Sequence, residues 1–101
     1  MEYSIQEEAS GTVIRVDGPF TIRDHDRFFE IVSLIKASHV TKIIFDLSEC
    51  HMIDSAALGM FVIASDEASA KEISLAIRGA SGKVKDIMLS VLFDNFYTFE
   101  D

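Results

Sequence analysis

The sequence predicts a single α/β domain with a mixed β-sheet and helices packed mostly on one face. The length of 101 residues, with 49% hydrophobic and 26% charged, is typical of one small domain, so we expect residues 1–101 to fold as a unit. Runs of β-branched residues alternate with segments whose apolar residues recur at helical spacing. One apolar run, residues 42–47, is nearly unbroken, as in a strand buried on both faces of an open sheet.

The N-terminal segment predicts paired strands, because Tyr3 and Ile5 alternate with polar residues and residues 12–16 form a β-branched run after Gly11. A turn follows at residues 17–19, and a brief strand is expected over residues 20–22. Acidic residues at positions 24 and 26 then mark the first turn of a helix. Its apolar stripe consists of Phe28, Ile31, Val32 and Ile35.

The second half predicts alternating strands and helices. The run at residues 42–47 is expected to be a central strand, followed by a loop and by a helix from Ser55 to about Ala70. Residues 73–77 form the next strand, closed by Gly79. Ser81 is expected to cap a third helix, and residues 93–99 form an aromatic edge or packing segment. The apolar stripe of that third helix is expected to be part of the core, and it consists of Val84, Ile87, Met88 and Val91.

The net charge and the cysteine content limit the classes of binding partner and the cellular compartment that we expect. The net charge of −8, without a basic stripe, disfavours binding to nucleic acid and to anionic lipid. The single cysteine, Cys50, excludes an internal disulfide and a zinc cluster, and it is expected to be a small buried residue. No pattern of a signal peptide begins the chain, and the apolar run 60–64 is far below the ~20 residues that a membrane span needs. We therefore expect a cytoplasmic protein without membrane insertion.

Functional groups of open α/β sheets gather where a strand ends and the next helix begins, here at residues 46–59. Asp54 is predicted to be the N-cap of the second helix, with the Ser55 hydroxyl pointing outward at the first helical position. Small residues at Ala56, Ala57 and Gly59 leave the helix accessible to a flat partner surface. Capping alone would also explain Asp54 and Ser55.

Other chemistries lack the residues they need. Asp54 and Ser55 are adjacent, so one histidine can hardly bond to both as a hydrolase triad requires, and no Gly-x-Ser-x-Gly motif surrounds the serine. His25-Asp26 has no second pair to complete a metal site, and neither glycine-rich phosphate loop is present. We expect no enzyme activity, no metal and no cofactor.

The second helix is apolar nearly all round in its first half, so it must be covered on more than one side. We expect its partner-facing side to differ from its core side. The residues expected to face a partner are Ala56, Ala57, Met60 and Ile63, and those expected to face the core are Leu58, Phe61 and Val62.

The stretch from Asp46 to Phe61 resembles the signature of the STAS domain, found in bacterial anti-sigma factor antagonists. In that family a buried strand leads through a loop to Asp-Ser at the head of a helix. Gly18-Pro19-Phe20-Thr21 matches the turn after the early strands, and Val84 to Phe99 resembles the last helix and closing segment. The sequence departs from the family pattern in having Ala56 for Ser or Thr, Ala57 for Gly, and Thr21 for an acidic residue.

The resemblance implies a regulatory binding protein that acts by partner switching. Ser55 matches the family's phosphorylated serine, which implies phosphorylation by a serine-kinase anti-sigma factor and dephosphorylation by a PP2C-type phosphatase. The alternative is an accessory subunit of a membrane transporter, with the same helix start used only for docking. The sequence leaves the oligomeric state open. The expected partner-binding residues are Thr21, Asp54, Ser55, Ala56, Ala57, Gly59 and Met60.

Overall fold

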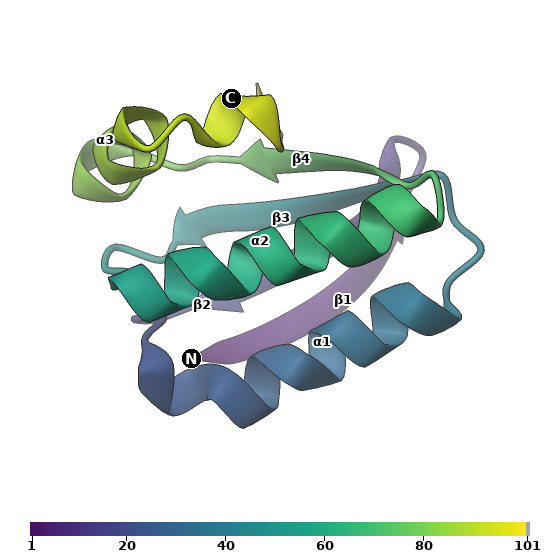
Figure 1. Ribbon diagram of the computed structural model, residues 1–101, viewed down its shortest axis with the longest axis horizontal. Helices are drawn as coiled ribbons and strands as arrows, with labels where there is room; N and C mark the ends of the chain where they lie inside the picture. Colours follow the sequence, from purple (N-terminus) through teal and green to yellow (C-terminus); the bar gives the residue numbers. More distant parts are fainter. Residues whose placement is uncertain (101) are drawn as a thin grey trace.

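A computed structural model describes residues 1–100, in which five strands form one mixed sheet in the order β1-β2-β3-β4-β5 (Figure 1). β1 (Glu2–Glu8) and β2 (Gly11–Asp17) form an antiparallel hairpin. β3 (Lys42–Glu49), β4 (Ser74–Arg78) and β5 (Thr98–Glu100) continue the sheet parallel to β2. The mixed sheet, the N-terminal hairpin and the central position of β3 confirm the predictions. The last residue of the predicted domain, 101, lies outside the described range.

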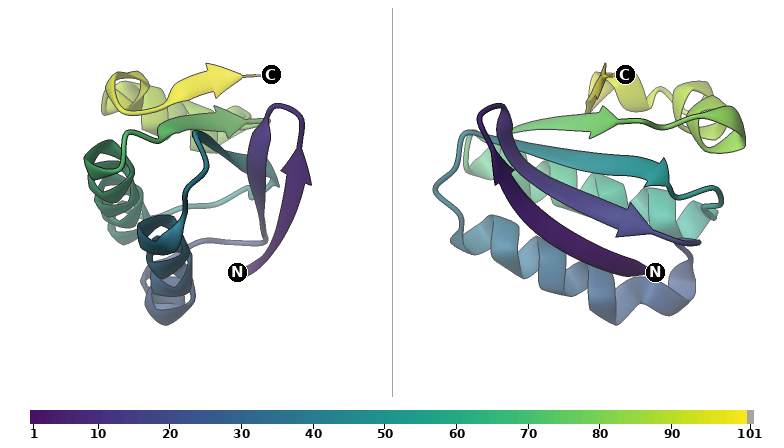
Figure 2. Two further views of the ribbon diagram at one scale, coloured as in Figure 1. Left: turned by 90° about the vertical axis from the view of Figure 1, so that its right-hand side faces the viewer. Right: turned by 180° about the vertical axis from the view of Figure 1, so that it is seen from behind.

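Two long helices, α1 (His25–Ala37) and α2 (Ser55–Ala70), lie side by side on one face of the sheet (Figure 2). The shorter α3 (Gly82–Ser90) lies beyond the carboxyl end of β4 (Figure 1). Two 3₁₀ turns, η1 (Ile22–Asp24) and η2 (Phe93–Asn95), precede α1 and follow α3. Within residues 1–100, no helix is long and apolar enough to cross a membrane.

The main core fills the space between the sheet and the two long helices. The predicted stripe of α1 is buried throughout. Aromatic rings pack at its centre with centroids 5.0 to 6.1 Å apart, and these rings belong to Phe20, Phe28, Phe45, Phe61 and Tyr97. The Tyr97 hydroxyl donates a 2.6 Å hydrogen bond to the Phe61 carbonyl, and burial raises the pKa of Tyr97 well above its ordinary value. The C-terminal segment is thereby joined to the middle of α2.

The opposite face of the sheet carries a second, small apolar cluster of Val13, Ile44 and Ala76. Ion pairs between strands that are not adjacent in the sheet span this region, from Lys42 of β3 to Glu100 of β5 at 2.7 Å and from Arg78 of β4 to Glu8 of β1 at 3.3 Å. β3 is therefore buried on both faces at its centre, as its unbroken apolar run predicts.

Two local predictions are wrong. Residues 20–22 form no strand, since Phe20 makes one isolated bridge to Ile53 and Ile22 begins η1. The stripe of α3 is only half buried, with Ile87 38% exposed and Val91 49% exposed. The reason is that α3 ends at Ser90 and does not lie under the α1–α2 layer. Ser81 occupies the predicted N-cap position, although its side chain makes no capping hydrogen bond.

Candidate functional site

The candidate site forms where the loop after β3 meets the loop after β2. The two loops are joined by backbone hydrogen bonds from Gly18 N–H to the Glu49 carbonyl (2.9 Å) and from Phe20 N–H to the Met52 carbonyl (2.9 Å). A third bond runs from Asp54 N–H to the Phe20 carbonyl at 3.4 Å. These bonds hold segment 18–24 against the start of α2, at the carboxyl ends of the parallel strands.

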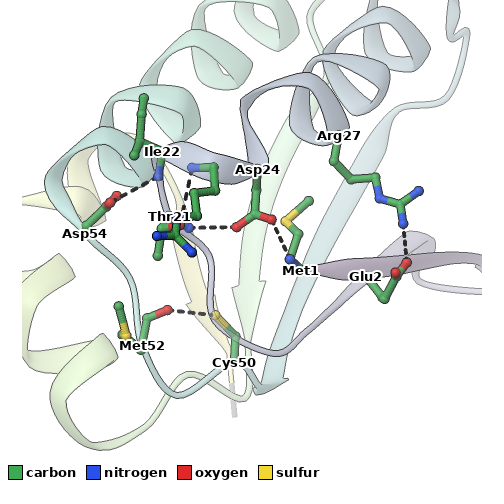
Figure 3. Close-up of polar contacts among 10 residues, drawn as sticks. Met1, Glu2, Thr21, Ile22, Asp24, Arg27, Cys50, Met52 and Asp54 are labelled. Atoms are coloured by element: carbon green, nitrogen blue, oxygen red, sulfur yellow. Dashed lines mark hydrogen bonds and ion pairs between the residues drawn. The ribbon is translucent and has the colours of Figure 1, made fainter.

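The Asp54 carboxylate uses both of its oxygens. Oδ1 accepts the Ala57 N–H at 2.8 Å, which confirms the predicted N-cap of α2. Oδ2 accepts the Ile22 N–H at 3.0 Å, from the other loop (Figure 3). Asp54 therefore caps the N-terminus of α2 and also connects it to η1 through a hydrogen bond.

Ser55 is the first residue of α2, and it is exposed. Unpaired N–H groups of the first turn and the positive end of the helix dipole lie next to its side chain. The structure thus places a hydroxyl group where solvent or another protein can reach it, directly beside a carboxylate.

Thr21 and Asp24 form a reciprocal cap around η1. The Thr21 hydroxyl accepts the Arg23 N–H at 3.3 Å, and the Asp24 carboxylate accepts the Thr21 N–H at 2.9 Å. Asp24 also pairs with the N-terminal ammonium group of Met1 (Figure 3). Partial burial alone would raise the pKa of Asp24, but the bonds from the ammonium group and from Thr21 N–H hold this pKa below its ordinary value.

Two exposed apolar side chains at this site escaped the sequence analysis. Ile22 is 57% exposed and Met52 is 52% exposed, and both line a hollow of about 540 Å³ with Pro19, Arg23 and Asp54. Ile22 was expected in the strand over residues 20–22, and Met52 belongs to no helical or alternating pattern, so periodicity identified neither side chain as part of a surface site. The signal that could have identified Met52 is that it is a large apolar residue in a polar loop without such a pattern.

The predicted rotation of α2 is wrong for two residues. Ala57 is fully buried and Met60 is only 4% exposed, so neither side chain faces outward. Phe61 faces the core as predicted, whereas Leu58 and Val62 are only half-buried. Both side chains belong to the main core, in which α2 packs against α1 and the sheet.

The outward side of α2 carries Ser55, Gly59 and Ile63, with Ile63 40% exposed. Ala56 is half-buried beside them, as is Thr21 on the neighbouring loop. Of the expected partner-binding residues, the structure therefore leaves Thr21, Asp54, Ser55, Ala56 and Gly59 at the surface. The structure places Ala57 and Met60 in the core instead.

The residues considered for other chemistries do not gather around Ser55. His25 lies 3.5 Å from Asp26 and His51 lies 3.8 Å from Glu49, both at the surface. Cys50 is 2% exposed, as predicted, and burial raises the pKa of its thiol, which donates to the Met52 carbonyl. Among residues 1–100, no group of three or more potential metal ligands is present.

Comparisons with known proteins agree with this geometry. The family model described as STAS domain matches residues 2–101. No curated protein matches the chain.

Solved structures show the same fold. The anti-sigma factor antagonist SpoIIAA in its unphosphorylated form is 19% identical over 99% of this chain and 88% of that chain, with a TM-score of 0.76. SpoIIAA from Bacillus in the phosphorylated form is 16% identical over 97% and 90% of the two chains, with a TM-score of 0.71. A sulfate transporter family protein from Wolinella succinogenes is 15% identical over 88% and 75%, with a TM-score of 0.76.

Identities this low establish similarity of fold, while the family model spans nearly the whole sequence. The five-stranded mixed sheet, the two helices on one face and the Asp54-capped start of α2 fit the same family. This chain belongs to the STAS domain family.

Proposed function

We propose that this protein is an anti-sigma factor antagonist-like binding protein that switches partners in the cytoplasm when Ser55 is phosphorylated, without catalysing a reaction itself. The observation that carries the proposal is the exposure of Ser55 as the first residue of α2, directly after the capping Asp54. The likeness to SpoIIAA, which is known in an unphosphorylated and a phosphorylated form, supports it.

The modification is a phosphoryl transfer from ATP bound to a serine-kinase anti-sigma factor. The Ser55 Oγ forms a bond to the γ-phosphorus, the bond from that phosphorus to the bridging oxygen breaks, and ADP leaves. The hydroxyl proton passes to a base of the kinase. A PP2C-type phosphatase reverses the modification when water attacks the phosphorus and inorganic phosphate leaves.

The docking surface consists of the outward side of α2 and the neighbouring loop. Ser55, Gly59 and Ile63 form a small, partly apolar stripe, and Ile22 and Met52 extend it across the hollow. A phosphate brings a charge of about −2 into this surface beside Asp54. The resulting desolvation penalty and repulsion release the partner.

The overall charge of −8 fits a partner with a basic surface and opposes nucleic acid and anionic lipid.

Phosphate incorporation tests the site. The wild type and two alanine variants are incubated with ATP and serine-kinase anti-sigma factors from the same genome. Ser81→Ala is the matched control, since Ser81 is also an exposed serine at a helix start. We expect the wild type and Ser81→Ala to be labelled and Ser55→Ala to remain unlabelled. Equal labelling of Ser55→Ala would contradict the site assignment.

A second candidate is a docking subunit of a membrane transporter, favoured by the likeness to the sulfate transporter family protein. In that function Ser55 is never phosphorylated, and the helix start is a contact surface only. Calorimetry with the purified partner separates the two functions. Weaker binding of Ser55→Asp than of Ser55→Ala supports the switch, whereas equal affinities favour docking alone. A neighbouring gene for a permease, rather than for a kinase or phosphatase, would favour the same alternative.

A further inference from the structure

The four backbone N–H groups of residues 21–24 all have an acceptor. Three of the acceptors lie within the segment: Thr21 N–H and Arg23 N–H bond to side chains of Asp24 and Thr21, and Asp24 N–H bonds to the Thr21 carbonyl. Only Ile22 N–H donates outside it, to Asp54 Oδ2 at 3.0 Å. Beside the ion pair of Asp24 with the Met1 ammonium group, one backbone N–H of the turn therefore donates to the residue that precedes Ser55 (Figure 3).

We propose that Asp54 is a positioning residue that couples the charge state of residue 55 to the turn at residues 21–24. With an unmodified serine, Asp54 holds the Ile22 N–H and fixes how the exposed Ile22 side chain is presented. A negative group on residue 55 breaks that bond and loosens the turn at Ile22, while Asp24 stays paired with Met1. The inference rests on the proposed function of Ser55, and it adds a second structural effect of the phosphorylation, at the turn of residues 21–24.

The bond to Ile22, rather than the cap bond to Ala57, is the one that breaks. The cap bond lies at the positive end of the α2 dipole, where a carboxylate is stabilised. The Ile22 N–H lies on an exposed turn and can take water as its acceptor instead. A phosphate that attracts the free N–H groups of the first turn also repels the carboxylate beside it. Repulsion therefore acts on the weaker of the two bonds.

The consequence for partner binding comes from Ile22. Its side chain is 57% exposed and lies on the same hollow as Met52. When the bond is present, a partner meets an ordered apolar side chain, and less entropy is lost on binding. When the bond is absent, the same contact requires the turn to be ordered first. A charge at residue 55 thus weakens binding both at α2 and at the adjoining turn.

The test measures the Ile22 amide in the free protein by NMR, through its rate of exchange with water and its proton chemical shift. Asp54→Asn retains an oxygen for the Ala57 N–H but loses the second acceptor. We expect it to speed exchange at Ile22 by about tenfold and to leave Ala57 protected. Asp26→Asn, which removes an exposed carboxylate from α1, is the control and should change neither amide.

Charge at residue 55 is tested with Ser55→Asp against Ser55→Asn, which has the same shape without the charge. We expect Ser55→Asp to shift the Ile22 resonance towards that of Asp54→Asn, and Ser55→Asn to leave it near the wild-type position. In the Asp54→Asn background, Ser55→Asp should cause no further change at Ile22. An Ile22 amide that is identical in Ser55→Asp and Ser55→Asn would overturn the proposal.

These measurements need neither kinase nor partner, so they separate the two proposals. If Ile22 is insensitive to charge while Ser55→Asp still weakens partner binding, the switch stands and the coupling through Asp54 is wrong. If Ile22 responds but Ser55 is never phosphorylated, the coupling stands and the proposed function is wrong.

Discussion

The first half of α2 carries small and apolar residues on two sides that have opposite environments. The inward side packs Ala57, Met60 and Phe61 into the core at 0 to 4% exposure. The outward side presents Ser55, Gly59 and Ile63 to solvent. The difference teaches that small and apolar residues serve both as core and as candidate docking surface within one helix. Position around the helix axis, rather than residue type, separates the two.

The largest expected effect is at the centre of the inward side. Phe61→Ala removes a ring that packs against five other aromatic rings, so we expect the free energy of unfolding to fall by about 3–5 kcal/mol. Ile63→Ala on the outward side should lower it by less than about 1 kcal/mol. Urea unfolding of both variants measures the difference. Equal losses would show that the two sides of α2 are not distinct.

Lysine substitutions test the same difference between the inward and outward sides of α2. Met60→Lys places an ammonium group at a position that is 4% exposed, and we expect it to lower the free energy of unfolding by about 3 kcal/mol. Ile63→Lys should change it by less than about 1 kcal/mol, because that side chain reaches water. Thermal unfolding followed by circular dichroism measures both. A stable Met60→Lys variant would support the rotation expected from the sequence.

A smaller effect is expected where α2 meets the C-terminal segment. Tyr97→Phe removes the hydroxyl that donates to the Phe61 carbonyl, so we expect a loss of about 1 kcal/mol in the free energy of unfolding. Tyr3→Phe is the control, since its hydroxyl donates to Glu30 at the surface and its loss should be within about 0.5 kcal/mol. If Tyr97→Phe were as mild as the control, the buried bond would not stabilise the fold.

The smallest expected change has the opposite sign. A Cβ added at Gly59 meets no atom within 4 Å, so Gly59→Ala should raise the free energy of unfolding by about 0.5–1 kcal/mol. If the outward side is the docking surface, the added methyl group should weaken partner binding at the same time. Denaturant unfolding and calorimetry with the purified partner measure the two quantities. Unchanged affinity would place the docking surface elsewhere.

The sequence predicted the elements that local rules govern. The stripe of α1, the bounds of α2 and the Asp54 cap follow from helical spacing and from the chemistry of a helix start, which involve neighbouring residues only. The unbroken apolar run of β3 also identified a strand covered on both faces. Asp54 and Ser55 could therefore be placed at the head of a helix from the sequence.

The predictions failed for residues whose burial or backbone conformation depends on contacts with another segment of the chain. The stripe of α3 was expected to be core, but only Val84 and Met88 are buried, whereas Ile87 and Val91 reach the surface. Ile22 was expected in a strand, but the cap formed by Thr21 and Asp24 turns the chain into η1. The bond from Ile22 to Asp54 joins residues 32 positions apart, and no spacing rule predicts it.

By itself, the sequence determined that this chain forms an acidic α/β domain with a capped, apolar helix after its central strand. Residue order alone sets hydrophobic periodicity, capping and net charge. Only the tertiary structure decided which side of α2 is buried, because a helix that is apolar all round can turn either side inward. Packing resolved that choice, since Phe61 fits among the rings of Phe20, Phe28 and Phe45 and Met60 is buried in the same core. With Phe61 inside, a rotation of about 100° per residue leaves Ser55, Gly59 and Ile63 facing solvent.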